Sequence, residues 1–133
     1  MTLAITGLYA SILAFVIIGL GYRVVRLRRK YRVGVLDGGH HELTQAIRIH
    51  GNATEWVPLV LILFACAESL QLSPWALHAL GIALVIARIL HILGLRRTVG
   101  RSFGRYAGIA GTWTVAIILS CYNLYHFVIQ ATL

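Results

Sequence analysis

The sequence has little charge and almost no acidic residues. Only 12% of its 133 residues are charged, and four Asp and Glu stand against twelve Lys and Arg. This charged share is about half that of an ordinary soluble domain, whereas 59% of the residues are hydrophobic. One small core cannot absorb that much apolar surface, which argues against a water-soluble globular protein. The composition therefore predicts an integral membrane protein.

Proline and cysteine are also scarce. Two prolines and no short repeat argue against a disordered or fibrous chain. Cys66 and Cys121 lie in apolar runs without CxxC spacing, so we expect neither a structural disulfide nor a dithiol centre. The pair His40-His41 lacks further ligands at metal-site spacing, and we predict no metal site.

The net charge of +8 needs an explanation other than nucleic acid. The basic residues are not interleaved with aromatic residues, and no zinc-finger spacing accompanies them, so no nucleic-acid partner is expected. In so apolar a chain, basic residues typically mark the cytoplasmic edges of membrane helices.

Four apolar stretches are long enough to cross a bilayer at about twenty residues each. We place them at about 3–26, 43–70, 74–97 and 106–130, with Ser73-Pro74 as the cap and first position of the third. They leave no room for an extramembrane domain, so residues 1–133 form one membrane domain. The predicted fold is an all-α bundle of four transmembrane helices.

The basic residues predict the orientation of the bundle. Six follow the first span and four follow the third, whereas the turn at 69–75 and both termini have none. The positive-inside rule therefore places both basic loops in the cytoplasm and both termini outside. Glu68, near the outer end of the second span, is interpreted as a solvated end residue.

Two polar patches lie inside the spans, where ionisable groups are costly and usually functional. Arg48, Asn52 and Glu55 stand at offsets 0, 4 and 7, which places them within an arc of about 60° on one helix face. Arg88 and His91 form a second patch at the same depth. We expect the two patches to face each other across a polar cleft that opens to the cytoplasm.

The cleft has two interpretations. Glu55 and Arg88 could neutralise each other and hold two helices together. Alternatively, the surplus of two arginines, an amide and an imidazole over one carboxylate favours an anionic ligand that brings its own carboxylates.

The stripe Arg48-x3-Asn52-x2-Glu55-Trp56-Val57-Pro58 resembles the second-helix signature of the MAPEG family, the membrane-associated proteins in eicosanoid and glutathione metabolism. The run Arg28 to Val33 is similar to the basic end of the family's first helix. Ala87-Arg88-x2-His91-x2-Gly94 is similar to its third-helix motif. The resemblance covers nearly the whole chain, and the small bacterial members look most similar.

The resemblance implies a homotrimer that binds glutathione, as co-substrate, between neighbouring subunits near the cytoplasmic surface. Positions matching Arg28, Arg48, Asn52, Glu55 and Arg88 hold the peptide in the family. His91 matches a contacting tyrosine or histidine, and His50 matches a glutamine contact of some relatives. Leu95 stands where several eicosanoid-making relatives carry a tyrosine. The arginine that activates the thiol falls near Arg101 and Arg105, and we favour Arg101 slightly.

The resemblance thus implies a glutathione S-transferase or peroxidase of the inner membrane, which conjugates the thiolate to lipophilic electrophiles arriving from the lipid. A non-enzymatic scaffold that binds lipid or glutathione is the alternative. A proton-coupled transporter could use Glu55 and His91 as a relay, but 133 residues contain no inverted repeat of the transporter kind.

Overall fold

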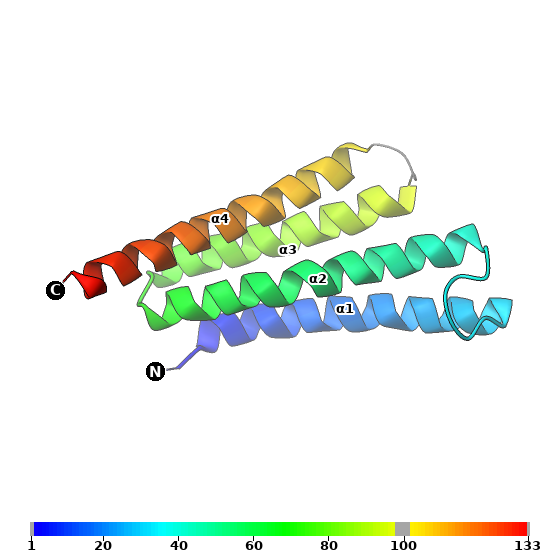
Figure 1. Cartoon of the computed structure of the whole chain (residues 1–133), viewed down its shortest axis with the longest axis horizontal. Helices are drawn as coiled ribbons and strands as arrows, with labels where there is room; N and C mark the ends of the chain where they lie inside the picture. Colours follow the sequence, from blue (N-terminus) through cyan, green and yellow to red (C-terminus); the bar gives the residue numbers. More distant parts are fainter. Residues whose placement is uncertain (1, 98–101, 133) are drawn as a thin grey trace.

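The computed structural model describes residues 2–97 and 102–132 as four long helices joined by short connectors (Figure 1). They are α1 (Ala4–Tyr31), α2 (His41–Ser69), α3 (Pro74–Arg97) and α4 (Phe103–Ala131). Each is long and apolar enough to cross a membrane. The predicted all-α bundle of four membrane-spanning helices is confirmed.

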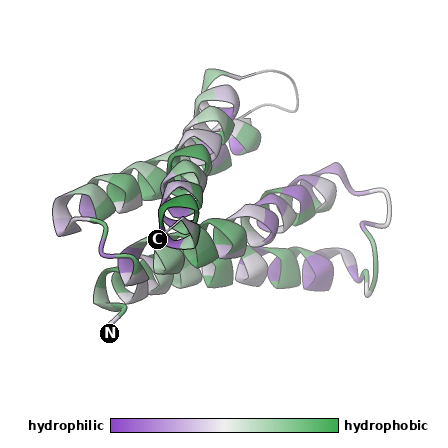
Figure 2. Cartoon of the chain, turned by 60° about the vertical axis from the view of Figure 1, so that its left-hand side comes forward, coloured by the Kyte–Doolittle hydropathy of each residue, from purple (hydrophilic) through white to green (hydrophobic). Residues whose placement is uncertain are grey.

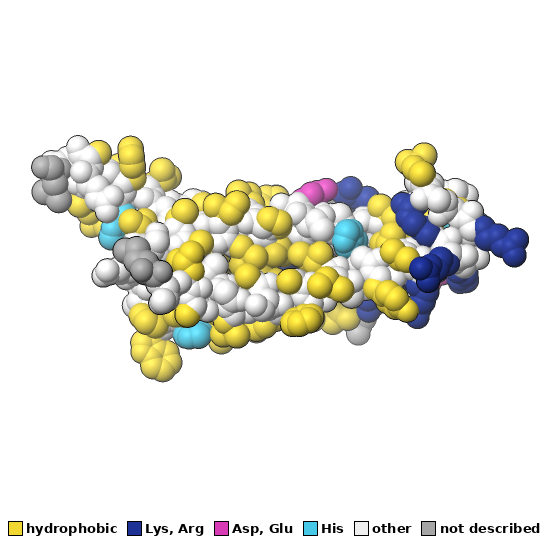
Figure 3. Space-filling model, turned by 90° about the horizontal axis from the view of Figure 1, so that it is seen from below, with side chains coloured by type: hydrophobic (Ala, Val, Ile, Leu, Met, Phe, Trp, Pro, Cys, Tyr) yellow, Lys and Arg dark blue, Asp and Glu magenta, His cyan; other side chains and the backbone are white. Residues whose placement is uncertain are grey.

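Three helices extend beyond the expected spans at the basic end of the molecule. α1 continues to Tyr31, α2 begins at His41 and α4 begins at Phe103. The 28 residues of α1 measure about 42 Å at the α-helical rise, whereas the hydrocarbon core of a bilayer is about 30 Å thick. The basic end of α1 therefore projects beyond the hydrocarbon. Side chains of Lys and Arg gather at this end, as Figure 3 shows.

The N-termini of α1, α3 and α4 are capped by side chains. Ser73 Oγ accepts from the Ala76 amide at 3.4 Å in front of Pro74, as the sequence predicts. Ser102 Oγ accepts from the Arg105 amide at 3.3 Å and caps α4. Glu68 is partly exposed near the end of α2, as expected for an end residue, but it also makes a structural contact that the sequence does not predict. Its carboxylate accepts from the Ile5 amide at 2.9 Å and the Thr6 amide at 2.7 Å, and so caps α1 from the end of α2.

The bundle consists of two helical hairpins. α1 packs along α2, and α3 packs most extensively along α4 (Figure 1). Both ends of the described chain lie at one end of the molecule, and the 32–40 connector lies at the other (Figure 1). Figure 2 shows that the hairpins diverge toward the connector end.

Glycine brings α3 and α4 into backbone contact. A Cβ added at Gly108 would lie 2.5 Å from the His91 backbone nitrogen and 2.6 Å from the Ala87 carbonyl oxygen. A Cβ at Gly94 would lie 2.3 Å from the Arg105 amide nitrogen. Only glycine allows this separation, which fixes His91 and Arg105 next to each other.

The hydrophobic core is uneven along the bundle. The largest cluster joins all four helices and includes Tyr9, Phe64, Leu84 and Leu119. At the connector end a separate cluster of Leu27, Leu43 and Ala46 belongs to the α1/α2 hairpin alone. Between these two, a further cluster joins α1 and α2 to α3 and consists of Leu20, Ile49, Ala53 and Ile92. Apolar packing between the hairpins thus extends from the terminal end to Ile92, and polar groups line the remaining space toward the connector end.

Candidate functional site

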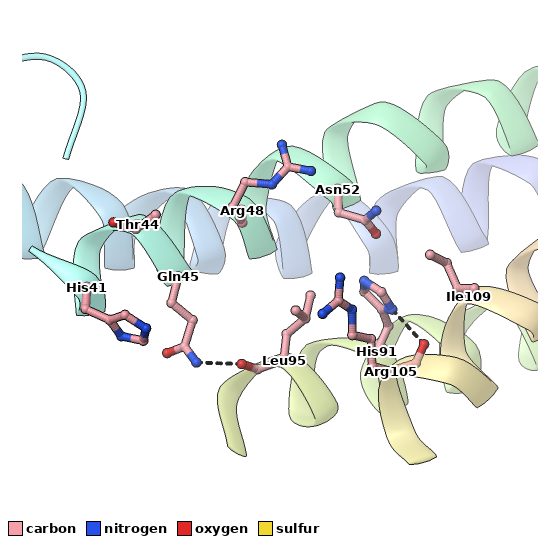
Figure 4. A pocket seen from close by; sticks show the side chains of 9 residues that line it. All are labelled: His41, Thr44, Gln45, Arg48, Asn52, His91, Leu95, Arg105 and Ile109. Carbon is pink, nitrogen blue, oxygen red and sulfur yellow. Dashed lines mark hydrogen bonds between the residues drawn. The ribbon is translucent and has the colours of Figure 1, made fainter. Parts of the chain in front are cut away.

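A pocket of about 260 Å³ lies between the two hairpins at the connector end (Figure 4). α2 forms one wall, and α3 and α4 form the other. The residues that line it are His41, Thr44, Gln45, Arg48, Asn52, His91, Leu95, Arg105 and Ile109. Arg48, Asn52 and His91 belong to the two polar patches that the sequence predicts to face each other, and the structure brings them together.

Arg88 lies buried next to this pocket. Its side chain is 1% exposed, and one terminal nitrogen donates to Asn52 Oδ1 at 3.0 Å. Its Nε and other terminal nitrogen have no hydrogen-bond partner in the described part of the chain. A buried cation with unused donors and no carboxylate partner is costly, so the site favours an anion that reaches it from the pocket.

His91 is fixed by its backbone neighbour on α4. Its side chain is 2% exposed, and its Nδ1 lies 3.1 Å from the Arg105 carbonyl oxygen (Figure 4). Because a carbonyl can only accept, Nδ1 donates in this bond. Nε2 has no partner among the described residues and is free to meet a ligand.

Glu55 lies outside the pocket lining, although a helical wheel places it within the same arc. Its side chain is exposed, and the one ion pair among the described residues joins Lys30 to Glu42 at 3.1 Å. Arg88 hydrogen-bonds to Asn52 instead of pairing with Glu55. The interpretation of a Glu55–Arg88 pair that holds two helices together therefore does not match this structure.

Three other candidate residues lie elsewhere or cannot be placed. The His50 ring packs against Gly21 of α1, with Nε2 3.3 Å from where a Cβ of that glycine would stand. Arg28 donates to the Gly34 carbonyl at 2.8 Å and stays on its own connector. Arg101 lies outside the described residues, whereas Arg105 lines the pocket.

The sequence analysis missed five lining residues. His41, Thr44 and Gln45 continue the Arg48–Asn52 stripe toward the start of α2, and their spacing of three and four residues could have predicted this. Gln45 Nε2 donates to the Leu95 carbonyl at 2.6 Å and ties α2 to the end of α3 (Figure 4). Nothing in the local sequence indicates that contact.

The pocket carries cationic and neutral polar groups without an acidic one among the residues that the structure describes. Its described lining contains Arg48 and Arg105, two histidines and two amides, but no carboxylate. An adjoining groove of about 630 Å³ shares Arg105 and Ile109 with it and adds Ser102, Phe103 and Tyr106. A cationic chamber thus borders an apolar, aromatic one, which suits an anionic ligand next to a lipophilic one.

Known proteins share this sequence over most of its length. The profile of the MAPEG family matches residues 6–125. The chain is 36% identical over 122 residues, 92% of each chain, to "Inner membrane protein YecN" of Escherichia coli K12. The protein of the same name from Escherichia coli O6:H1 matches to the same extent. With its four-helix bundle and its Arg48, Asn52 and Arg88 cluster, the chain belongs to the MAPEG family.

Proposed function

We propose that the protein binds glutathione in the pocket between the hairpins and conjugates its thiolate to lipophilic electrophiles in the inner membrane. The observation that carries the proposal is the pair of buried side chains, Arg88 and His91, whose nitrogens lack partners beside a chamber with two further arginines. Glutathione brings two carboxylates for the arginine donors, and its N–H groups can donate to the free Nε2 of His91. Membership of the MAPEG family is consistent with a glutathione-related function, and the relative named as an inner membrane protein supports the location alone.

A homotrimer is part of the proposal. Arg48 and Glu55 are exposed on α2, and charges at this depth are costly when they face lipid. A neighbouring subunit that covers this face removes the cost and brings Glu55 to the edge of a shared cleft. There it pairs with the ammonium group of glutathione, while Arg48 and Arg88 pair with the carboxylates.

The chemical requirement is a thiolate at neutral pH. Lowering a thiol pKa by about two units from about 8.5 takes roughly 3 kcal/mol of differential stabilisation, which one positioned arginine supplies. Arg105 and Arg101 are the candidates. The sulfur attacks an electrophilic carbon held in the adjoining apolar groove, a carbon–sulfur bond forms, and the leaving group departs with its electron pair. Proximity and charge stabilisation suffice without a covalent enzyme intermediate.

A second candidate function is binding without catalysis. Leu95 lines the pocket at the position where several eicosanoid-making relatives carry a tyrosine, so a hydroxyl that could contact the thiol is missing. A glutathione- or lipid-binding scaffold fits this difference.

Titration of the purified trimer with glutathione separates these candidates. Binding that is accompanied by ultraviolet thiolate absorbance supports the enzyme, binding without that absorbance supports the scaffold, and no binding contradicts both assignments of the pocket to glutathione.

Matched variants test the assignment of the pocket. R48A and E55A should each weaken glutathione binding by about 2 kcal/mol or more, because each leaves a charged ligand group without its partner. R96A removes an exposed arginine that does not line the pocket and should leave binding unchanged. If E55A fails to form the trimer and the wild-type protein does not bind glutathione, Glu55 serves assembly of the trimer and not ligand binding.

A further inference from the structure

The connector between α1 and α2 turns back along the bundle instead of extending beyond it (Figure 1). The Val33 amide donates to the Arg28 carbonyl at 3.0 Å, and the Arg28 side chain donates to the Gly34 carbonyl at 2.8 Å. Val33 packs against the cluster of Leu27, Leu43 and Ala46. Residues 33–36 therefore lie beside the last turns of α1, level with its basic residues.

The connector presents two apolar side chains outward. Val35 is 78% exposed and Leu36 is 77% exposed. Leu36 also has a left-handed backbone with φ +58°, which is unfavourable for a residue other than glycine. Val35 and Leu36 form an apolar tip. Because hydrogen bonds fix the connector backbone on both sides of this tip, the two side chains are held in their outward position.

Uncompensated cations lie at the end of α1 that leads into the connector. Arg26, Arg29 and Arg32 are exposed and have no ion-pair partner among the described residues. Two carboxylates lie in this region. Glu42 accepts from Lys30 Nζ at 3.1 Å and is paired with that cation, whereas Asp37 accepts from the neutral Thr44 hydroxyl at 2.6 Å and keeps its negative charge. Residues 26–42 carry five Lys and Arg against two Asp and Glu, so the net charge of the segment that contains Val35 and Leu36 is positive.

We propose that the 33–40 connector is an interfacial anchor for anionic phospholipid. Val35 and Leu36 insert at the boundary between headgroups and acyl chains, and Arg29 and Arg32 contact lipid phosphates. An apolar tip beside basic residues, at the level where a helix longer than the hydrocarbon emerges, matches the chemistry of an anionic membrane surface. This inference does not depend on a bound glutathione.

The test places a fluorophore on the tip of the intact protein. In a C66S/C121S background, V35C is labelled with an environment-sensitive dye and the protein is reconstituted in nanodiscs of phosphatidylcholine with phosphatidylglycerol. We expect strong quenching by a nitroxide near the lipid headgroup and weak quenching by aqueous iodide. Strong iodide quenching would place the tip in water, and resistance to both quenchers would mean that protein covers it. Either result overturns the proposal.

Lipid charge supplies the second measurement. The dye is quenched in turn by nitroxide-labelled phosphatidylglycerol and by nitroxide-labelled phosphatidylcholine. We expect the apparent association constant from quenching to be about fivefold or more higher for phosphatidylglycerol, which is the preference that one surface arginine provides. R29Q/R32Q should remove this preference, as should high salt. R96Q removes one exposed charge from α3 and should preserve it. Equal quenching by the two lipids, or an equal loss in R96Q, contradicts the arginine contacts.

Discussion

Arg105 occupies an unusual position for a cation. It stands in the first turn of α4, with its amide bonded to the Ser102 cap, where the helix dipole disfavours positive charge. Its carbonyl is held by His91, and its side chain reaches both the polar pocket and the apolar groove. A thiolate between the two chambers would offset the unfavourable dipole.

We therefore expect R105A to abolish the thiolate absorbance of bound glutathione while affinity stays within about tenfold, since the arginine acts on the sulfur and not on the carboxylates. R101A is measured alongside it, because the family resemblance places the activating arginine near Arg101 and Arg105 without choosing between them. Difference spectra at saturating glutathione check this. Full absorbance in both variants would show that neither arginine is the activator.

Glu68 caps α1, although it lies 62 or more positions away in the sequence. It satisfies two of the free amides at the start of α1 and places a negative charge at the positive end of the helix dipole. E68A should lower the free energy of unfolding by about 1–2 kcal/mol, as measured by denaturant unfolding in detergent micelles. E68Q keeps an acceptor and should lose less. If E68Q is as stable as the wild type, the charge contributes nothing beyond the hydrogen bonds.

At the level of elements, the α3/α4 hairpin depends on close helix contact. In G108A the new methyl group would overlap His91 and Ala87, so the helices must separate. We expect a loss of about 1–3 kcal/mol in stability and weaker glutathione binding, because His91 moves with α3. G19A is the control. Its Cβ meets nothing within 4 Å, and alanine favours the helix. Thermal unfolding with and without glutathione measures both effects.

The 32–40 connector has its own pH dependence. Hydrogen bonds from Thr44 and from the Gly39 amide lower the pKa of Asp37 below its ordinary value. A depressed folded-state pKa stabilises the connector fully above the ordinary value of about 3.9, and this contribution is lost as the pH falls through the lower, folded value.

We expect amide hydrogen exchange in the 33–40 segment to accelerate when the pH falls below about 4, after correction for the intrinsic exchange rate. D37N should exchange faster at neutral pH and lose the dependence. A wild-type profile that is flat through this window contradicts the role of Asp37.

At the scale of the whole molecule, both ends of the described chain share one end of the bundle and the basic groups gather at the other (Figures 1 and 3). We propose that the basic end is cytoplasmic. A periplasm-dependent reporter fused after Leu133 should be active, and the same reporter inserted between Gly38 and Glu42 should be inactive. The reverse pattern would place the pocket opposite the cytosolic glutathione pool.

The sequence predicts those features that depend on local pattern. Hydropathy gives the four helices, and helical spacing brings Arg48 and Asn52 onto the face that meets His91. Glu55 shows what helical spacing cannot predict. It shares an arc of about 60° with Arg48 and Asn52 on α2, but the pocket reaches only the part of that arc that holds Arg48 and Asn52. The Gln45–Leu95 and Glu68–Ile5 bonds join residues 50 and 63 positions apart. Such contacts depend on how helices are placed side by side, which periodicity does not specify.

The hairpin arrangement also bears on how the chain is made. Each hairpin has internal packing of its own, with a separate apolar cluster in α1/α2 and backbone contact in α3/α4. A nascent chain can therefore leave the insertion machinery as two successive helix pairs that dock afterwards. The pocket has one wall from each pair, so it exists only once both pairs have been made and have docked. A ligand that fills it would act on the docking step and would rescue variants that fail in docking, but not those that fail in insertion.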